Sequence, residues 1–323
     1  MQRTNRIANG LEDILRSARK AIVLGVGGGG DIVGTLPTAR FLDLFGISSI
    51  LGGLSWERFV YDPEPGTRAL SEVRNVQPLA STVWLANSDT ATHQGVRFAE
   101  SEVAAVLATQ TLLVDLSEGV AGLVAGLRTA MAELEADLLV GVDVGGDSLA
   151  AGNEPGLRSP LADAMVLAAV SELSNEFLSC WGVLGYGSDG ELSAEEIERA
   201  LANVASKKGL LGAWGVTPAV ADELAQLIER VRTEASNVVL RSARGEFGCT
   251  AIRDGTRSVG LSPVCTVTFY VDPAVLAKST PLAAAVSAST SLEEANAALL
   301  RLGIRTEYEF EKEMKRRGLG RYP

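Results

Sequence analysis

Short apolar runs alternate with stretches of helical periodicity through the first 190 residues, and this alternation constrains the fold more than any other feature of the chain. The apolar runs are continuous, as is typical of strands buried on both faces of a parallel sheet. They predict strands at residues 20–26, 47–51, 82–86, 111–116, 137–142 and 180–184. The stretches between them predict helices at residues 32–45, 100–108, 118–134 and 161–178. This order of elements predicts a Rossmann-like α/β fold with a doubly wound, mostly parallel sheet.

The pattern of apolar and polar residues changes after Glu191. Two capped segments predict helices at residues 193–206 and 217–235. Further segments of the C-terminal part predict strands at residues 238–240, 249–253, 257–261 and 265–271, and helices from residue 291 and at 306–317. We therefore expect three parts that form one body. They are a Rossmann-like core at 1–190, a helical insert at 191–236 and a small C-terminal α+β part at 237–323.

Charge and residue counts narrow the classes of partner. The chain has 40 acidic and 29 basic residues, a net charge of −11, which argues against nucleic acid because phosphate backbones favour basic surfaces. Its single histidine, His93, excludes any site built on two histidines. No apolar run reaches the ~18 residues of a membrane span. We expect a cytoplasmic protein that acts on a small molecule and binds neither membrane nor nucleic acid. The sequence is compatible with a homo-oligomer.

A glycine-rich turn follows the first predicted strand directly. Gly25, Gly27 and Gly30 fit the pattern G-x-G-x-x-G between a strand and a helix, where backbone amides can approach a bound ligand closely. The glycines predicted to bind the ligand are Gly27, Gly28, Gly29 and Gly30. Asp31 closes this turn and would repel a bare phosphate unless a cation bridges the two groups, so we treat Asp31 as a candidate catalytic residue. A tight turn without a ligand is the structural alternative.

The same pattern recurs at two further strand ends. Residues 138–147 run from a strand into Gly145 and Gly146, and residues 185–191 surround Asp189 with glycines. In an open parallel sheet the carboxyl ends of the strands meet at one edge, where ligands bind. We therefore predict that Gly145, Gly146 and Asp189 contribute to the same ligand site.

Carboxylates near the second glycine turn suggest a hard cation. Asp143 and Asp147 are predicted to hold a metal ion, and Asp147 and Glu154 join Asp31 as candidate catalytic residues. Oxygen ligands without histidine favour Mg²⁺ over zinc. The alternative is that Asp143 and Asp147 only accept hydrogen bonds from backbone amides of the turn.

Three short motifs resemble a known family. They are GGGGD at residues 27–31, DVGGD at 143–147 and SPLAD at 159–163, and the pair Glu57-Arg58 followed by DPEPG at 62–66 fits the same pattern. At these residues the chain resembles domain of unknown function 1152, an uncharacterised family of archaeal and actinobacterial proteins. The resemblance covers roughly the first 190 residues and, less distinctly, residues 257–272. It implies a shared α/β fold and assigns no reaction.

The motifs together favour an enzyme that binds a nucleotide or another phosphorylated metabolite. Mg²⁺ would assist phosphoryl or group transfer, or hydrolysis. An oxidoreductase that uses NAD(P) or a flavin is one alternative, although the second strand lacks the acid that binds the ribose in dinucleotide folds. A non-catalytic ligand-binding or regulatory protein is the other alternative.

Overall fold

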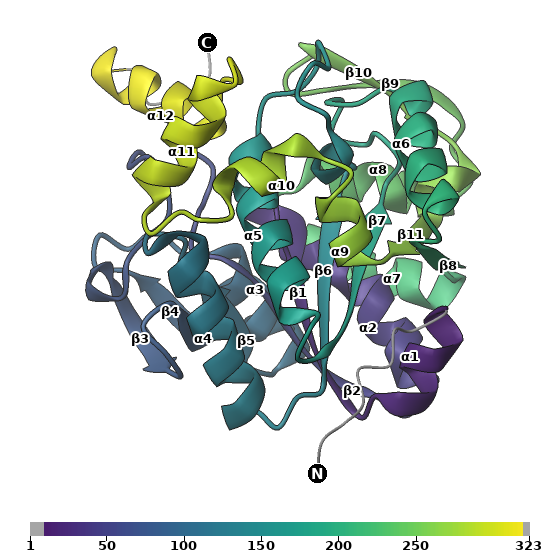
Figure 1. Cartoon of the computed structure of the whole chain (residues 1–323), viewed down its shortest axis with the longest axis horizontal. Coiled ribbons are helices and arrows are strands. Elements are labelled where there is room, and N and C mark those ends of the chain that lie inside the picture. The colour runs from purple at the N-terminus through teal and green to yellow at the C-terminus, as the bar shows by residue number, and fades with distance from the viewer. Residues whose placement is uncertain (1–9, 319–323) are drawn as a thin grey trace.

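A mixed β-sheet forms the centre of the molecule in a computed structural model that describes residues 10–318 (Figure 1). Its strand order is β3-β4-β5-β2-β1-β6-β7-β11-β8. The strands are β1 (Lys20–Gly25), β2 (Ser48–Leu54), β3 (Val73–Pro78), β4 (Val83–Thr92), β5 (Thr111–Val114), β6 (Leu138–Val144), β7 (Leu178–Leu184), β8 (Leu210–Gly215) and β11 (Val267–Val271). β5, β2, β1, β6 and β7 pair in parallel, whereas β4 and β11 are antiparallel to both of their neighbours. The predicted α/β fold with a mostly parallel sheet is confirmed.

Helices cover both faces of this sheet, as Figure 1 shows for α4, α5, α9 and α10 on the near face. The helices are α1 (Leu11–Ser17), α2 (Thr35–Asp43), α3 (Ala99–Leu107), α4 (Gly119–Glu133), α5 (Pro160–Leu173), α6 (Ala194–Ser206), α7 (Pro218–Ile228), α8 (Glu234–Ala243), α9 (Pro273–Ala277), α10 (Pro281–Val286), α11 (Leu292–Arg301) and α12 (Glu307–Arg316). In β1, Ile22 and Leu24 pack into the core beneath α4 and α5, and Ala21 and Val23 pack into the core beneath α1 and α2. This two-sided burial explains why the strand is a continuous apolar run.

The structure differs from the predictions mainly at the edges of the sheet and after residue 210. The edge strands β3 and β8 have no predicted counterpart, because β3 is largely exposed and polar and β8 contains two glycines. β8 lies between α6 and α7, so the segment predicted as a helical insert also adds a strand to the main sheet. The short helices α9 and α10 were likewise not predicted.

The predicted strand at 238–240 is wrong, because these residues belong to α8. Val238 packs under the small hairpin formed by β9 (Gly248–Ile252) and β10 (Arg257–Leu261), whereas Val239 and Leu240 face the main core. A helix buried on two sides loses the polar face that marks helical periodicity. The helix predicted at 217–235 ends at Ile228, and α8 begins after Thr233, whose Oγ1 accepts the amide of Ser236.

None of the helices within residues 10–318 has both the length and the apolar character that a membrane crossing requires.

Candidate functional site

A cavity of about 1530 Å³ opens at the carboxyl ends of β1, β6 and β7. The loops that follow these strands line it, together with the start of α8, the β9–β10 turn and the start of α12. The three glycine-containing turns therefore lie at one edge of the sheet, as the parallel topology predicts.

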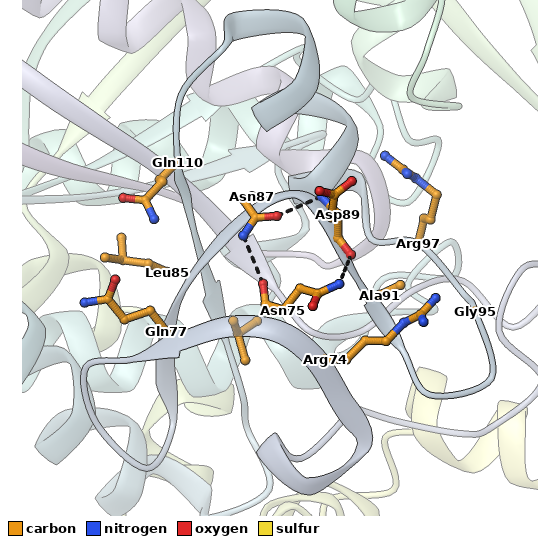
Figure 2. Close-up of a pocket in the computed structure, with 11 residues that line it drawn as sticks. Arg74, Asn75, Gln77, Leu85, Asn87, Asp89, Ala91, Gly95, Arg97 and Gln110 are labelled. Carbon is orange, nitrogen blue, oxygen red and sulfur yellow. Dashed lines mark hydrogen bonds between the residues drawn. The ribbon is translucent and has the colours of Figure 1, made fainter.

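A second hollow of about 700 Å³ lies on the β3–β4 hairpin (Figure 2). Its polar groups satisfy one another: Asn75 donates to the carbonyl of Asp89 at 2.9 Å, and Asn87 donates to the carbonyl of Asn75 at 3.1 Å. None of the residues that line this hollow belongs to the three predicted glycine turns or is a buried carboxylate. We therefore take the larger cavity as the candidate site.

In the first turn, two of the backbone amides predicted to bind a ligand donate hydrogen bonds within the protein. The amide of Gly27 donates to Oδ2 of Asp31 at 3.0 Å, and the amide of Gly29 donates to the carbonyl of Trp56 at 2.8 Å. Gly27, Gly28 and Gly29 line the cavity. Gly30 instead packs against the side chain of Thr233, where a Cβ would lie 2.5 Å from its nearest atom.

The carboxyl of Asp31 lines the cavity directly beneath this turn. Burial, with the nearby charge of Asp143, raises the pKa of Asp31 to about 7, although Arg58 and the amide of Gly27 oppose the shift. A carboxyl with this pKa can exchange a proton near neutral pH, which is what a general acid or base requires.

In the second turn, the predicted residues hold the loops together. Oδ1 of Asp143 accepts the amide of Gly146 at 2.9 Å, and Oδ2 accepts the amide of Ser148 at 3.0 Å and also its hydroxyl. A Cβ on Gly145 would lie 2.3 Å from Cγ of Asp189. Gly145 thus lets the second and third turns approach each other closely, and Asp143 fixes the second turn.

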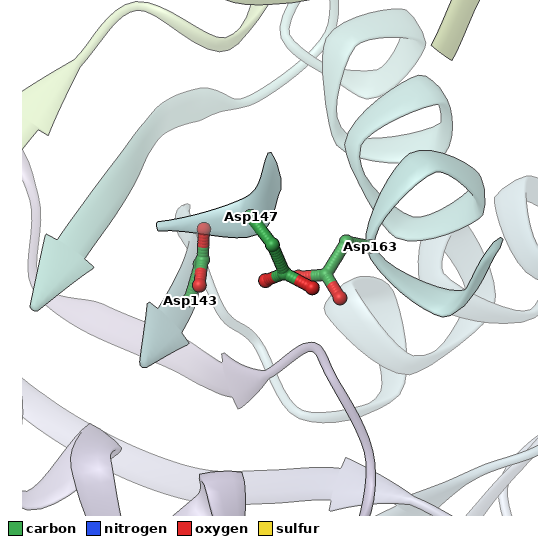
Figure 3. Close-up of side chains that lie close together, drawn as sticks. All are labelled: Asp143, Asp147 and Asp163. Atoms are coloured by element: carbon green, nitrogen blue, oxygen red, sulfur yellow. The ribbon is translucent and has the colours of Figure 1, made fainter. Parts of the chain in front are cut away.

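Five carboxylates form a buried group, here called the acidic cluster, whose members are Asp143, Asp147, Asp163, Asp189 and Glu191. Oxygens of Asp143, Asp147 and Asp163 lie within 4.8 Å of one another (Figure 3), and so do oxygens of Asp147, Asp189 and Glu191. Figure 3 shows the carboxylates of Asp147 and Asp163 directed toward each other from the loop after β6 and from α5.

Asp163 differs from its neighbours in having no hydrogen bond. Its side chain is 1% exposed, and within residues 10–318 neither Oδ1 nor Oδ2 has a hydrogen-bond partner. Burial raises the pKa of Asp163 well above its ordinary value, and the charges of Asp143 and Asp31 add to this effect. A buried carboxylate without a partner is costly, and a bound cation removes that cost.

Burial likewise raises the pKa values of Asp147 and Asp189 well above the ordinary range, with further contributions from neighbouring carboxylates. Like charges so close together cannot all ionise unless positive charge compensates them. The donor set is oxygen only, which suits Mg²⁺. The sequence predicted a metal ion at Asp143 and Asp147, and the structure brings a carboxylate oxygen of Asp163 within 4.8 Å of theirs.

Two glutamates occupy the start of α5. Oε2 of Glu191 accepts the amides of Arg158 at 2.6 Å and Ser159 at 2.9 Å. Glu307, from α12, accepts the amides of Leu161 at 3.1 Å and Ala162 at 2.8 Å. The N-terminus of α5 is therefore capped by the protein's own carboxylates. No local sequence signal places Glu307 there, because the contact joins residues 145 positions apart.

Glu154, predicted as catalytic, borders the cavity but is engaged with its own loop. Its carboxylate accepts the amides of Ala151 at 2.7 Å and Gly152 at 2.8 Å. This geometry gives Glu154 a part in shaping the loop between β6 and α5. His93 is exposed and is not among the residues that line the cavity.

Arginines surround the opening. Those that line the cavity are Arg58, Arg158, Arg232, Arg253, Arg257 and Arg305. The β9–β10 hairpin supplies both Arg253 and Arg257. Sequence reasoning did not single out Arg232 or Arg305, which come from two separate connections between helices. Carboxylates inside the cavity and arginines around its opening suit a ligand that carries phosphate together with a divalent cation.

The fold and this cavity define a Rossmann-like α/β protein with a carboxylate-lined cavity at the carboxyl edge of its sheet. The sequence model of a family described as "Protein of unknown function (DUF1152)" matches residues 22–315, and the chain belongs to this family. The resemblance carried by GGGGD, DVGGD and SPLAD is thereby confirmed. No curated protein and no solved structure is similar enough to match.

Proposed function

We propose that this protein is a small-molecule enzyme that binds a nucleotide or another phosphorylated metabolite with Mg²⁺ and catalyses phosphoryl or group transfer, or hydrolysis. Asp147 and Asp163 would hold the cation, with Asp143 within reach. The observation that carries the proposal is the carboxylate of Asp163, which is buried, receives no hydrogen bond from the described part of the chain and is directed at Asp147.

The charge distribution supports a phosphorylated ligand. A phosphate near the acidic cluster needs positive charge on its other side, and arginines supply it around the opening. Arg257 links the two regions, because its Nη1 lies 3.2 Å from Oε1 of Glu191 and donates to the carbonyl of Asp189 at 2.8 Å.

The chain's own residues can divide the chemistry among them. Bound Mg²⁺ would polarise a phosphoryl oxygen and orient the ligand. The arginines would bind the remaining phosphate oxygens. Asp31, with a pKa of about 7 and its Oδ2 fixed by the amide of Gly27, can accept a proton from an attacking water or hydroxyl group.

Thermal unfolding with ADP tests the proposal. We expect ADP to stabilise the wild-type protein more in the presence of Mg²⁺ than in EDTA, and Asp147→Asn to abolish this difference. Asp115→Asn is the matched control, because Asp115 is equally buried at the end of β5, bonded to Thr67 and Ser117 and absent from the cavity lining. Stabilisation by NAD(P) without metal, unchanged in Asp147→Asn, would favour an oxidoreductase and contradict the proposal.

A further inference from the structure

Three arginines converge on one glutamate at the opening of the cavity. Nη1 of Arg58 lies 3.9 Å from Oε2 of Glu234, and Nε of Arg253 lies 3.5 Å from the same oxygen. The positive charge of Arg257 also acts on the carboxylate of Glu234. Glu234 therefore faces three guanidinium groups. Arg257 is also paired with Glu191, and the charge of Asp254 acts on Glu234 as well.

Glycines of the turns position two of these arginines. The stem of Arg58 lies over Gly29, where a Cβ would come within 3.2 Å of its Cγ. The stem of Arg257 lies over Gly190 in the same way, at 3.2 Å from its Cδ. The glycines of the first and third turns therefore have a second effect, which is to let arginine side chains lie flat across the loops.

The donors of Arg58 and Arg253 are largely unused. Both ion pairs to Glu234 are too long and too poorly aligned for hydrogen bonds. Nε of Arg253 is buried and has no hydrogen-bond partner within the described part of the chain. Arg58 and Arg253 are only 23% and 26% exposed. Half-buried guanidinium groups with free donors are suited to a planar or tetrahedral oxyanion.

Glu234 is the first residue of α8 and lines the cavity. Its Oε1 accepts the backbone amide of Arg253 at 2.8 Å, which holds the β9–β10 turn against the helix. A carboxylate at the N-terminus of a helix and beside arginines occupies the place that an external anion would take.

We infer that Arg58, Arg253 and Arg257 form a subsite for a phosphate group of the ligand, and that Glu234 occupies this subsite until phosphate displaces it. The inference rests on the proposed function, since it names where the phosphorylated ligand binds. It differs from that proposal in needing no metal: the subsite consists of guanidinium groups and the start of α8.

Binding of inorganic phosphate in EDTA, followed by thermal-shift titration at constant ionic strength with chloride, tests the subsite. Glu234→Gln removes the competing charge and should tighten phosphate binding by ~10-fold, the equivalent of one charge-assisted contact. Arg253→Gln should weaken binding by ~10-fold or more. AMP should show the same two changes, because a phosphate ester presents the same oxyanion.

Glu246→Gln is the matched control for net charge. Glu246 also pairs with an arginine of α8, Arg241, at 2.7 Å, but neither residue lines the cavity. We expect the phosphate affinity of the Glu246→Gln variant to equal that of the wild type. Binding that is unchanged or weaker in Glu234→Gln, or unchanged in Arg253→Gln, would overturn the subsite. Because EDTA is present throughout, that outcome would leave the metal prediction for Asp147 and Asp163 standing on its own test.

Discussion

Replacing Asp163 by Asn should have opposite effects on stability with and without a divalent cation. Without metal, the wild-type protein buries a carboxylate whose two oxygens receive no hydrogen bond from residues 10–318, beside the carboxylates of Asp143 and Asp147. An unsatisfied buried polar group costs ~1–3 kcal/mol. Asn has nearly the same shape, carries no charge and can donate to Asp147, so Asp163→Asn should raise the free energy of unfolding by ~1–3 kcal/mol in EDTA.

With metal, the order should reverse. A cation at 100 times its dissociation constant stabilises the folded protein by ~2.7 kcal/mol if it binds only the folded state. The wild type gains this stabilisation, whereas Asp163→Asn has lost a ligand and gains little of it. Urea unfolding at pH 8, in EDTA and in a series of Mg²⁺ concentrations, measures both effects on the same two proteins.

Two results would refute this reasoning. One is a lower stability of Asp163→Asn in EDTA, which would mean that the carboxylate has a favourable partner. The other is an equal gain from Mg²⁺ in both proteins, which would remove Asp163 from the metal site. Asp115→Asn, outside the cavity, should gain as much from Mg²⁺ as the wild type does.

Two further predictions concern Glu311, which lines the cavity, and Gly25, which ends β1 before the first glycine turn. Burial raises the pKa of Glu311 to about 8, against hydrogen bonds from Trp56 and Gly66, so its protonated form is favoured in the folded state and stability falls as pH rises from about 4.5 toward 8. Glu311→Gln should not lose stability in this way. Its free energy of unfolding, measured by chemical denaturation, should rise relative to that of the wild type by up to ~1.4 kcal/mol per pH unit. Equal pH dependence of the two proteins would contradict the raised pKa of Glu311. Gly25→Ala places a Cβ 2.4 Å from the backbone carbon of Asp31, and should lower the free energy of unfolding by ~1–3 kcal/mol in urea; a neutral effect would show that the turn can relax.

The sequence predicts the interior of this fold well and its periphery poorly. β1 and β6 are buried on both faces, so their apolar runs identify them without knowledge of any contact. β3 and β8 lie at the two edges of the sheet, where neighbouring segments decide whether a polar stretch becomes a strand. Residues 238–240 of α8 were predicted as a strand because burial on two sides of the helix removes the polar face that marks helical periodicity.

The candidate site divides in the same way. Gly27 and Asp31 are recognised because one short segment contains the strand, the turn and the helix start. Asp163 stands out as the end of the SPLAD motif, but only the tertiary structure shows that it lies beside Asp143 and Asp147. Glu307 has no such signal, because its role depends on α12 meeting the start of α5. The structure also shows that Asp143 accepts hydrogen bonds from its own turn.

The most direct test of the central claim is to locate Mn²⁺, as a substitute for Mg²⁺, by anomalous diffraction from crystals of the wild-type protein. The account predicts a peak between the carboxylates of Asp147 and Asp163, at ~2.1 Å from their oxygens as for hard cations of this size, and no such peak in crystals of Asp163→Asn. Mn²⁺ found only on the surface, with none at Asp147 and Asp163, would contradict it.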